Sequence, residues 1–90
     1  MTIQEYEEKL LQLIDDEIDT ATDDELFAGG YLRGHISLAA AECESEKQED
    51  IEEYKRCIAI NIENNKHEMS PKDRHIVNEY WGYLEIKANS

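Results

Sequence analysis

Apolar side chains recur every three or four positions along most of this chain, and this spacing constrains its fold more than any other feature. In the first stretch they stand at Ile3, Tyr6, Leu10, Leu13, Ile14 and Ile18. Because an α-helix turns once about every 3.6 residues, that period places them on one helical face. Thr2 and Glu5 form a capping-box pattern at the start of the stretch, which predicts a first helix over residues 3–20.

Thr22 and Glu25 repeat the capping-box pattern, and Asp23 and Asp24 place negative charge in the following turn, where it interacts favourably with the helix dipole. A second helix is therefore predicted from about residue 23. Its apolar face is predicted to comprise Leu26, Phe27, Tyr31, Leu38 and Ala41. The Gly29–Gly30 pair predicts a kink or a short break, because each glycine costs about 1 kcal/mol relative to alanine inside a helix.

A third helix is predicted to open with Ser45 and Gln48. Its apolar positions are Ile51, Tyr54, Ile58 and Ile62. The alternation of Ile58, Ile60 and Ile62 also fits a strand, but residues 48–56 are rich in strong helix formers and favour the helix.

Ser70 and Pro71 mark the clearest boundary in the chain, because serine is a preferred N-cap and proline is well tolerated at the first helical position. They predict a fourth helix over residues 71–87. Its buried face is predicted to hold Ile76, Val77, Tyr80, Trp81 and Leu84.

Ninety residues support one hydrophobic core, so residues 1–90 are expected to form a single domain. Four helices joined by short loops predict an all-α fold, a compact antiparallel bundle. Gly30 and Gly34 have the spacing that lets two helix backbones approach closely, and they are predicted to pack inside this bundle.

The charge of the chain lies almost entirely in its first half. Residues 1–53 hold 17 acidic and three basic residues, a balance of −14, whereas residues 54–90 hold five acidic and six basic residues, a balance of +1. Such a field repels nucleic acids and anionic lipids, so neither nucleic acid nor membrane is an expected partner. It favours encounter with a basic protein surface.

The chain carries no sign of export or membrane insertion. Its longest nearly apolar stretch is far shorter than the roughly 20 residues that span a bilayer. Its first residues include Glu5, Glu7 and Glu8, whereas a secretory signal begins with basic residues. We therefore expect a cytoplasmic protein in which Cys43 and Cys57 are free, unreactive thiols.

No cofactor, metal or catalytic constellation is expected. In the register of a calcium-binding EF-hand loop beginning at Asp15, Thr20 replaces the required glycine and Leu26 replaces the bidentate glutamate. The Glu-x-x-His pairs of di-iron bundles and the close Cys and His spacing of zinc sites are also missing.

Five residues of the second predicted helix are candidates for a binding site: Asp23, Asp24, Tyr31, Arg33 and His35. Arg33 could hold an anion and His35 could act as an acid or base, provided that both side chains reach one pocket. Alternatively, Arg33 pairs with the acidic first turn of its own helix, and His35 is an ordinary half-exposed side chain.

The run from Asp23 to His35, DDELFAGGYLRGH, resembles the motif of the YfcL-like family of small bacterial proteins. The resemblance extends to Leu13-Ile14-Asp15 near the N-terminus. Near the C-terminus it includes Ser70-Pro71, Asp73, Trp81 and Leu84. It implies similar size and helical character, but no activity, cofactor or partner.

These observations favour a non-enzymatic interaction module whose acidic first half meets a basic protein or a second copy of itself. One alternative is a small-molecule or anion-binding protein, or an enzyme, that uses Arg33 and His35. Another is a nucleic-acid mimic, which would need carboxylates spaced like phosphates along one face.

Overall fold

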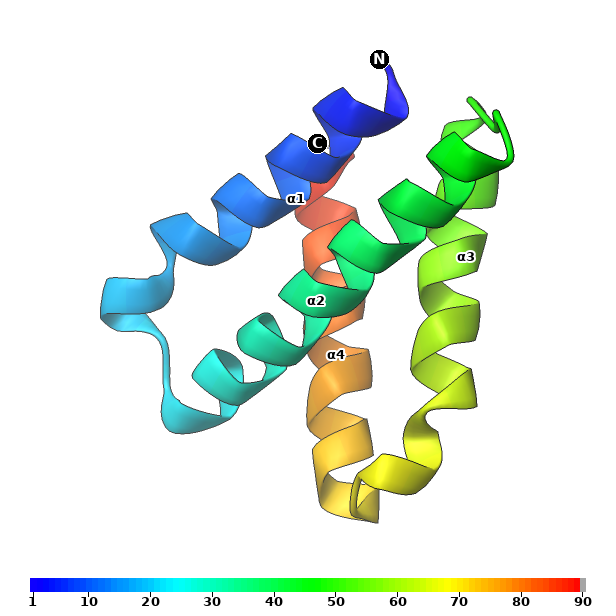
Figure 1. The fold of residues 1–90 in the computed structure, drawn as a ribbon. Helices are drawn as coiled ribbons and strands as arrows, with labels where there is room; N and C mark the ends of the chain where they lie inside the picture. Colours follow the sequence, from blue (N-terminus) through cyan, green and yellow to red (C-terminus); the bar gives the residue numbers. More distant parts are fainter. Residues whose placement is uncertain (90) are drawn as a thin grey trace.

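A computed structural model of the chain, which describes residues 1–89, contains four α-helices and two single-turn 3₁₀ helices (Figure 1). The elements are α1 (Ile3–Asp16), η1 (Ile18–Thr20), α2 (Asp23–Ser45), α3 (Ile51–Asn64), η2 (Lys66–Glu68) and α4 (Pro71–Ala88). No strand occurs within residues 1–89. The prediction of an all-α fold with four helices is therefore confirmed.

Three helices begin where their capping residues predict. Thr2 and Thr22 form complete capping boxes at the starts of α1 and α2. The Ser70 hydroxyl accepts a hydrogen bond from the backbone N–H of Asp73 at 3.2 Å, and Pro71 occupies the first turn of α4. Each cap satisfies a backbone N–H group that has no partner within the helix.

The predicted start of α3 is wrong, because Ser45 is the last residue of α2. The chain turns at Lys47, whose φ of 58° is left-handed, and the backbone N–H of Gln48 donates to the carbonyl of Cys43 at 2.8 Å. This bond closes the end of α2 in the manner of a helix C-terminal motif. Asp50 is the residue that caps α3, through a bond from the backbone N–H of Glu52.

α2 is not broken at Gly29–Gly30; the chain bends instead at the end of α1. α2 is continuous from Asp23 to Ser45, whereas α1 ends at Asp16 and does not reach residue 20. The chain bends at Glu17, where α1 passes into η1. Tertiary packing along α2 offsets the low helix propensity of its glycines.

The helices form a compact antiparallel bundle in which α2 is central (Figure 1). α1 runs antiparallel to α2 on one side, α3 lies on the other side, and α4 crosses behind it. The molecule measures 35 × 29 × 18 Å along its principal axes. The face of α2 that points away from α4 is left uncovered by the other helices (Figure 1).

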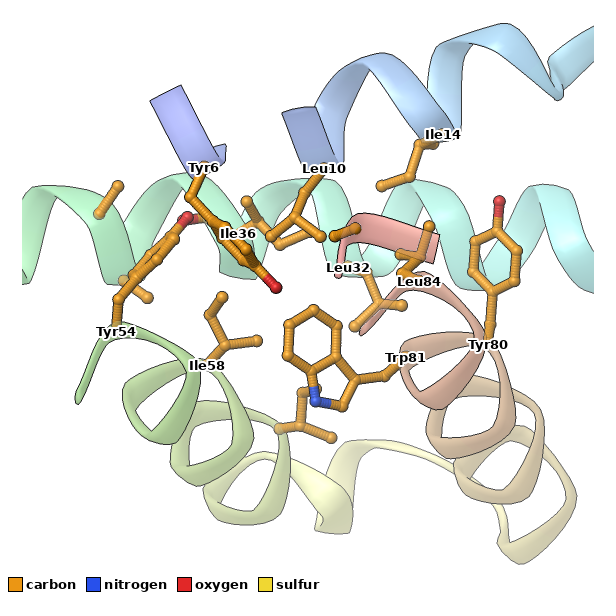
Figure 2. Packing of buried hydrophobic residues seen from close by; sticks show 14 of the residues in the cluster. Tyr6, Leu10, Ile14, Leu32, Ile36, Tyr54, Ile58, Tyr80, Trp81 and Leu84 are labelled. Carbon is orange, nitrogen blue, oxygen red and sulfur yellow. The ribbon is translucent and has the colours of Figure 1, made fainter. Parts of the chain in front are cut away.

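One cluster of buried side chains, contributed by all four helices, forms the core. Figure 2 shows Trp81 between α3 and α4, below Leu32 and Ile36 of α2. The Tyr54 hydroxyl donates to the carbonyl of Ile36 at 2.9 Å, which joins α3 to α2. Tyr54 is fully buried, and this burial raises the pKa of its hydroxyl.

The predicted apolar faces agree with this core in three helices. In α4, Val77, Tyr80, Trp81 and Leu84 are buried and Ile76 is half-buried. In α3, Ile58 and Ile62 are buried while Ile60 is 51% exposed, which is the helical pattern and excludes the strand alternative. In α1 the predicted face is largely correct, although Ile18 in η1 is exposed.

The predicted face of α2 is wrong. Leu26, Phe27 and Leu38 are 39–48% exposed, Ala41 is exposed and Tyr31 is half-buried. The buried residues of α2 are instead Ala28, Gly29, Leu32, Ile36, Ala39, Ala40 and Cys43. Because α2 is apolar around most of its circumference, its sequence period does not distinguish the covered side from the open one.

Candidate interaction site

The five candidate residues lie on α2, but they do not gather in one place. Asp23 and Asp24 are exposed in its first turn. Arg33 is exposed and makes an ion pair with Asp15 of α1, with 2.9 Å between its Nη2 and the carboxylate Oδ2. Tyr31 and His35 are half-buried on a different side of the helix.

The pairing of Arg33 with the acidic first turn of α2 is therefore wrong. Eight or more residues separate Arg33 from that turn, which is more than two helical turns, or about 12 Å along the axis. The antiparallel α1 instead places Asp15 beside Arg33. Both side chains are roughly 40% exposed, at 44% and 39%, so solvent screens the pair.

Tyr31 and His35 lie in contact along α2 with their rings tilted and 4.5 Å between ring centroids, and Phe27 continues the row at 6.3 Å from Tyr31. This arrangement follows from the i,i+4 spacing of the three residues. Within residues 1–89 neither the Tyr31 hydroxyl nor His35 Nδ1 has a hydrogen-bond partner. Burial, and secondarily the charge of Glu68, raises the pKa of Tyr31.

Arg33 and His35 therefore do not converge. Residues two apart on a helix point to nearly opposite sides, and their contacts agree: Arg33 reaches α1, whereas His35 packs on Tyr31. Arg33 lines a cavity of about 130 Å³ between α1 and α2, and His35 is not part of its lining. This volume is below the roughly 300–1,000 Å³ of most small-molecule sites.

Gly29 is the most closely packed of the three glycines of α2. A Cβ placed there would lie 3.1 Å from Cγ2 of Ile14 and 3.5 Å from the Tyr80 ring. A Cβ at Gly30 or Gly34 would meet no atom within 4 Å, and both residues are exposed. The predicted internal packing of Gly30 and Gly34 is therefore wrong, because the helical phase turns them toward solvent.

Comparison with known proteins explains the resemblance of the Asp23–His35 run. The model of the family described as "YfcL protein" matches residues 4–86. The protein of Escherichia coli (strain K12) named "Uncharacterized protein YfcL" is 42% identical over 89 residues, which cover 97% of each chain. This chain belongs to the YfcL family. No solved structure matches it.

In this YfcL-family chain the antiparallel pairing of α1 and α2 gathers the carboxylates into two clusters at opposite ends of α2. The first acidic cluster follows from the junction of α1 and α2 and comprises Asp15, Asp16, Glu17, Asp19, Asp23, Asp24 and Glu25. The second acidic cluster combines the start of α1 with the end of α2 and comprises Glu5, Glu7, Glu8, Glu42, Glu44, Glu46, Glu49 and Asp50. Thr2 and Gln4 line one surface hollow together with Glu44, Lys47 and Glu49, which places these two chain segments side by side.

Few of these carboxylates are neutralised. Within residues 1–89 the ion pairs of the two clusters are Arg33 with Asp15 and Lys87 with Glu17, the latter at 3.7 Å. No charged side chain in the described part of the chain is buried. The negative charge of the first half therefore faces solvent at both ends of α2.

Sequence reasoning missed the contacts of Glu17. Its carboxylate accepts hydrogen bonds from the hydroxyls of Tyr83 and Tyr80, two α4 residues whose rings stack with centroids 5.8 Å apart. Burial, with the charge of Glu17 as a secondary cause, raises the pKa of Tyr80 to about 12. More than sixty positions separate these partners in the chain, so no local signal reveals them.

Among residues 1–89 the possible metal ligands form no metal-binding group, and both thiols have raised pKa values. Across residues 1–89 no group of three or more His, Cys, Asp or Glu side chains is arranged to hold a metal ion. Cys43 is buried and Cys57 half-buried, both as free thiols, and burial raises the pKa of each, that of Cys57 to about 12. High thiol pKa values disfavour the nucleophilic thiolate. None of the helices in this part of the chain is both long and apolar enough to cross a membrane.

Proposed function

We propose that this YfcL-family protein is a non-enzymatic interaction module of the cytoplasm whose two acidic clusters bind a basic protein. The observation that carries the proposal is the exposure of these carboxylates, of which Asp15 and Glu17 are the two that make ion pairs within residues 1–89. Unpaired surface charges of one sign steer partners of the opposite sign and add specificity to the complex.

A basic partner suits this surface better than a second copy does. Two identical chains, each with a formal net charge of −13, repel one another. Nucleic-acid mimicry is also less favoured, because residues 26–41 of α2 contain no Asp or Glu and interrupt the carboxylates between the two clusters. The anion-binding alternative would need Arg33 and His35 on one side of α2, and their contacts place them on different sides.

Affinity capture from the native cell, with matched variants, tests the proposal. In one variant Asp19→Asn, Asp23→Asn and Asp24→Asn remove three charges from the first acidic cluster. In the control, Glu63→Gln, Glu68→Gln and Glu85→Gln remove three charges from α3, η2 and α4. We expect the cluster variant to retain several-fold less partner than the control, because only the cluster variant loses charge from the proposed surface.

The salt dependence of partner capture is the second part of the test. Exposed charges are screened over about 10 Å at 0.1 M salt and about 3 Å at 1 M, so the captured protein should be released steeply across this range. A partner retained equally at both ends of the range, or lost equally from the two variants, would contradict the proposal.

A further inference from the structure

The outward face of α2 is apolar or weakly polar over its whole central stretch. We define the outward face by the exposed, uncharged residues of 26–41, namely Leu26, Phe27, Gly30, Gly34, Ser37, Leu38 and Ala41. Their spacing of three and four places them along one side of the helix, opposite the buried Leu32 and Ile36. In Figure 1 no other helix covers this side of α2.

The arrangement of side chains on this face has the form of a helix-packing surface. Small residues, Gly30, Gly34 and Ala41, follow its middle, and the larger Leu26 and Leu38 flank them. Glycine in the middle of an exposed helix is destabilising by roughly 0.5–1 kcal/mol relative to alanine. A Cβ at either glycine would meet nothing within 4 Å, although Gly30 also borders the small cavity between α1 and α2. Close packing within this chain therefore does not account for them. A second backbone approaching this face would make use of both.

The charge on either side of the outward face indicates which kind of partner could bind it. The outward face lies between the first and second acidic clusters, and Arg33, the one basic residue within 26–41, is already paired with Asp15. A second copy of this chain would place acidic ends against acidic ends in either orientation, because both ends of α2 are acidic. A helix with an apolar centre and lysines or arginines at its two ends would be complementary in both respects.

We propose that the outward face of α2 docks an amphipathic helix of a basic partner, with the apolar side of that helix on Gly30 and Gly34 and its cationic ends at the two acidic clusters. This inference rests on the proposed function and names the surface and the partner class. The contact would extend about 24 Å along α2, the length of sixteen helical residues. Such a contact is smaller than a standard interface of about 1,600 Å², so micromolar affinity is expected for an isolated helix.

Two synthetic peptides of about 18 residues, identical in composition and rich in lysine, leucine and alanine, serve as probes. In the first, leucine and alanine occupy one helical face and lysines fill the first and last turns. In the second, the same residues are scattered so that no apolar face forms. Calorimetric titration at low salt should show the first peptide binding about tenfold more tightly than the second, the ratio expected when helix-face contacts add to the charge attraction.

Gly34→Gln tests the surface without endangering the fold. Its side chain enters open space and glutamine is a good helix former, so the variant should fold, while the added bulk blocks close approach of a helix. Gly82→Gln on α4 is the matched control, because Gly82 also has no neighbour within 4 Å. We expect Gly34→Gln to weaken binding of the first peptide about tenfold, a typical loss on disrupting the centre of an interface, and Gly82→Gln to leave it unchanged.

The peptide-binding results distinguish a failure of the proposed docking face from a failure of the proposed acidic interaction module. Equal binding of both peptides, with no effect of Gly34→Gln, would overturn the docking face and leave the acidic interaction module intact. Failure of both peptides to bind at low salt would overturn both proposals. Sedimentation that shows a dimer dissociated by Gly34→Gln would overturn the basic helix as occupant in favour of a second copy.

Discussion

The two faces of α2 are alike in composition and opposite in environment. Leu32 and Ile36 on the inner face are fully buried, whereas Leu26 and Leu38 on the outward face are 44% and 48% exposed. In α1 and α3 only one face is apolar, and there the spacing identifies the buried side correctly. The comparison shows that apolar periodicity locates a core face only where the opposite side of the helix is polar.

Truncating one leucine on each face should give the largest difference. Leu32→Ala leaves a cavity among fully packed side chains and should lower the free energy of unfolding by about 2–5 kcal/mol. Leu38→Ala removes a half-exposed side chain and should change it by less than about 0.5 kcal/mol. Urea denaturation of the two variants measures both values, and similar losses at the two sites would show that the outward face is covered.

Enlarging adjacent glycines should produce a smaller difference. Gly29→Leu forces a side chain against Ile14 and Tyr80 and should destabilise the protein by about 1–3 kcal/mol. Gly30→Leu, one position along, has no neighbour within 4 Å of its Cβ and extends toward the small cavity between α1 and α2. It should not destabilise the protein, because leucine is the better helix former. Thermal unfolding followed by circular dichroism distinguishes them. A fall in stability at Gly30 as large as that at Gly29 would contradict the assigned faces.

Gly34→Ala should stabilise the isolated chain. Nothing lies within 4 Å of the new methyl group, so the substitution mainly removes the conformational freedom of glycine in the unfolded state. We expect the free energy of unfolding to rise by about 0.5–1 kcal/mol in urea titrations. A decrease would mean that another molecule already packs against Gly34 in solution.

Breaking the ion pair at the edge of the outward face should have the smallest effect. Arg33→Gln and Asp15→Asn each remove one partner of a solvent-exposed pair, for which a coupling energy of about 0.2–1 kcal/mol is typical. A double-mutant cycle by urea denaturation measures this coupling, which should decrease at high salt. Coupling well above 1 kcal/mol would show that the pair is shielded from solvent, as a bound partner would shield it.

The candidate site could be predicted only in part. The run from Asp23 to His35 indicates the family, and the family match to residues 4–86 confirms that prediction. Pairing of Arg33 with residues 23–25 is one of the two alternatives that the sequence leaves open, because these acidic residues precede it on the same helix. A straight helix keeps them too far apart, and the partner comes from α1. Glu17 and Tyr83 were not foreseen as partners, since they meet only when α4 packs against the end of α1.

Local chemistry determined where the helices α1, α2 and α4 begin, because a cap joins residues only three positions apart and forms without help from the rest of the chain. It also determined the uneven charge, which is a count along the sequence. Packing decided which side of α2 is buried, which of its glycines is closely packed, and that the carboxylates gather at two ends. These features depend on which helices become neighbours. The sequence of a helix that is apolar on both sides does not indicate which side will be buried.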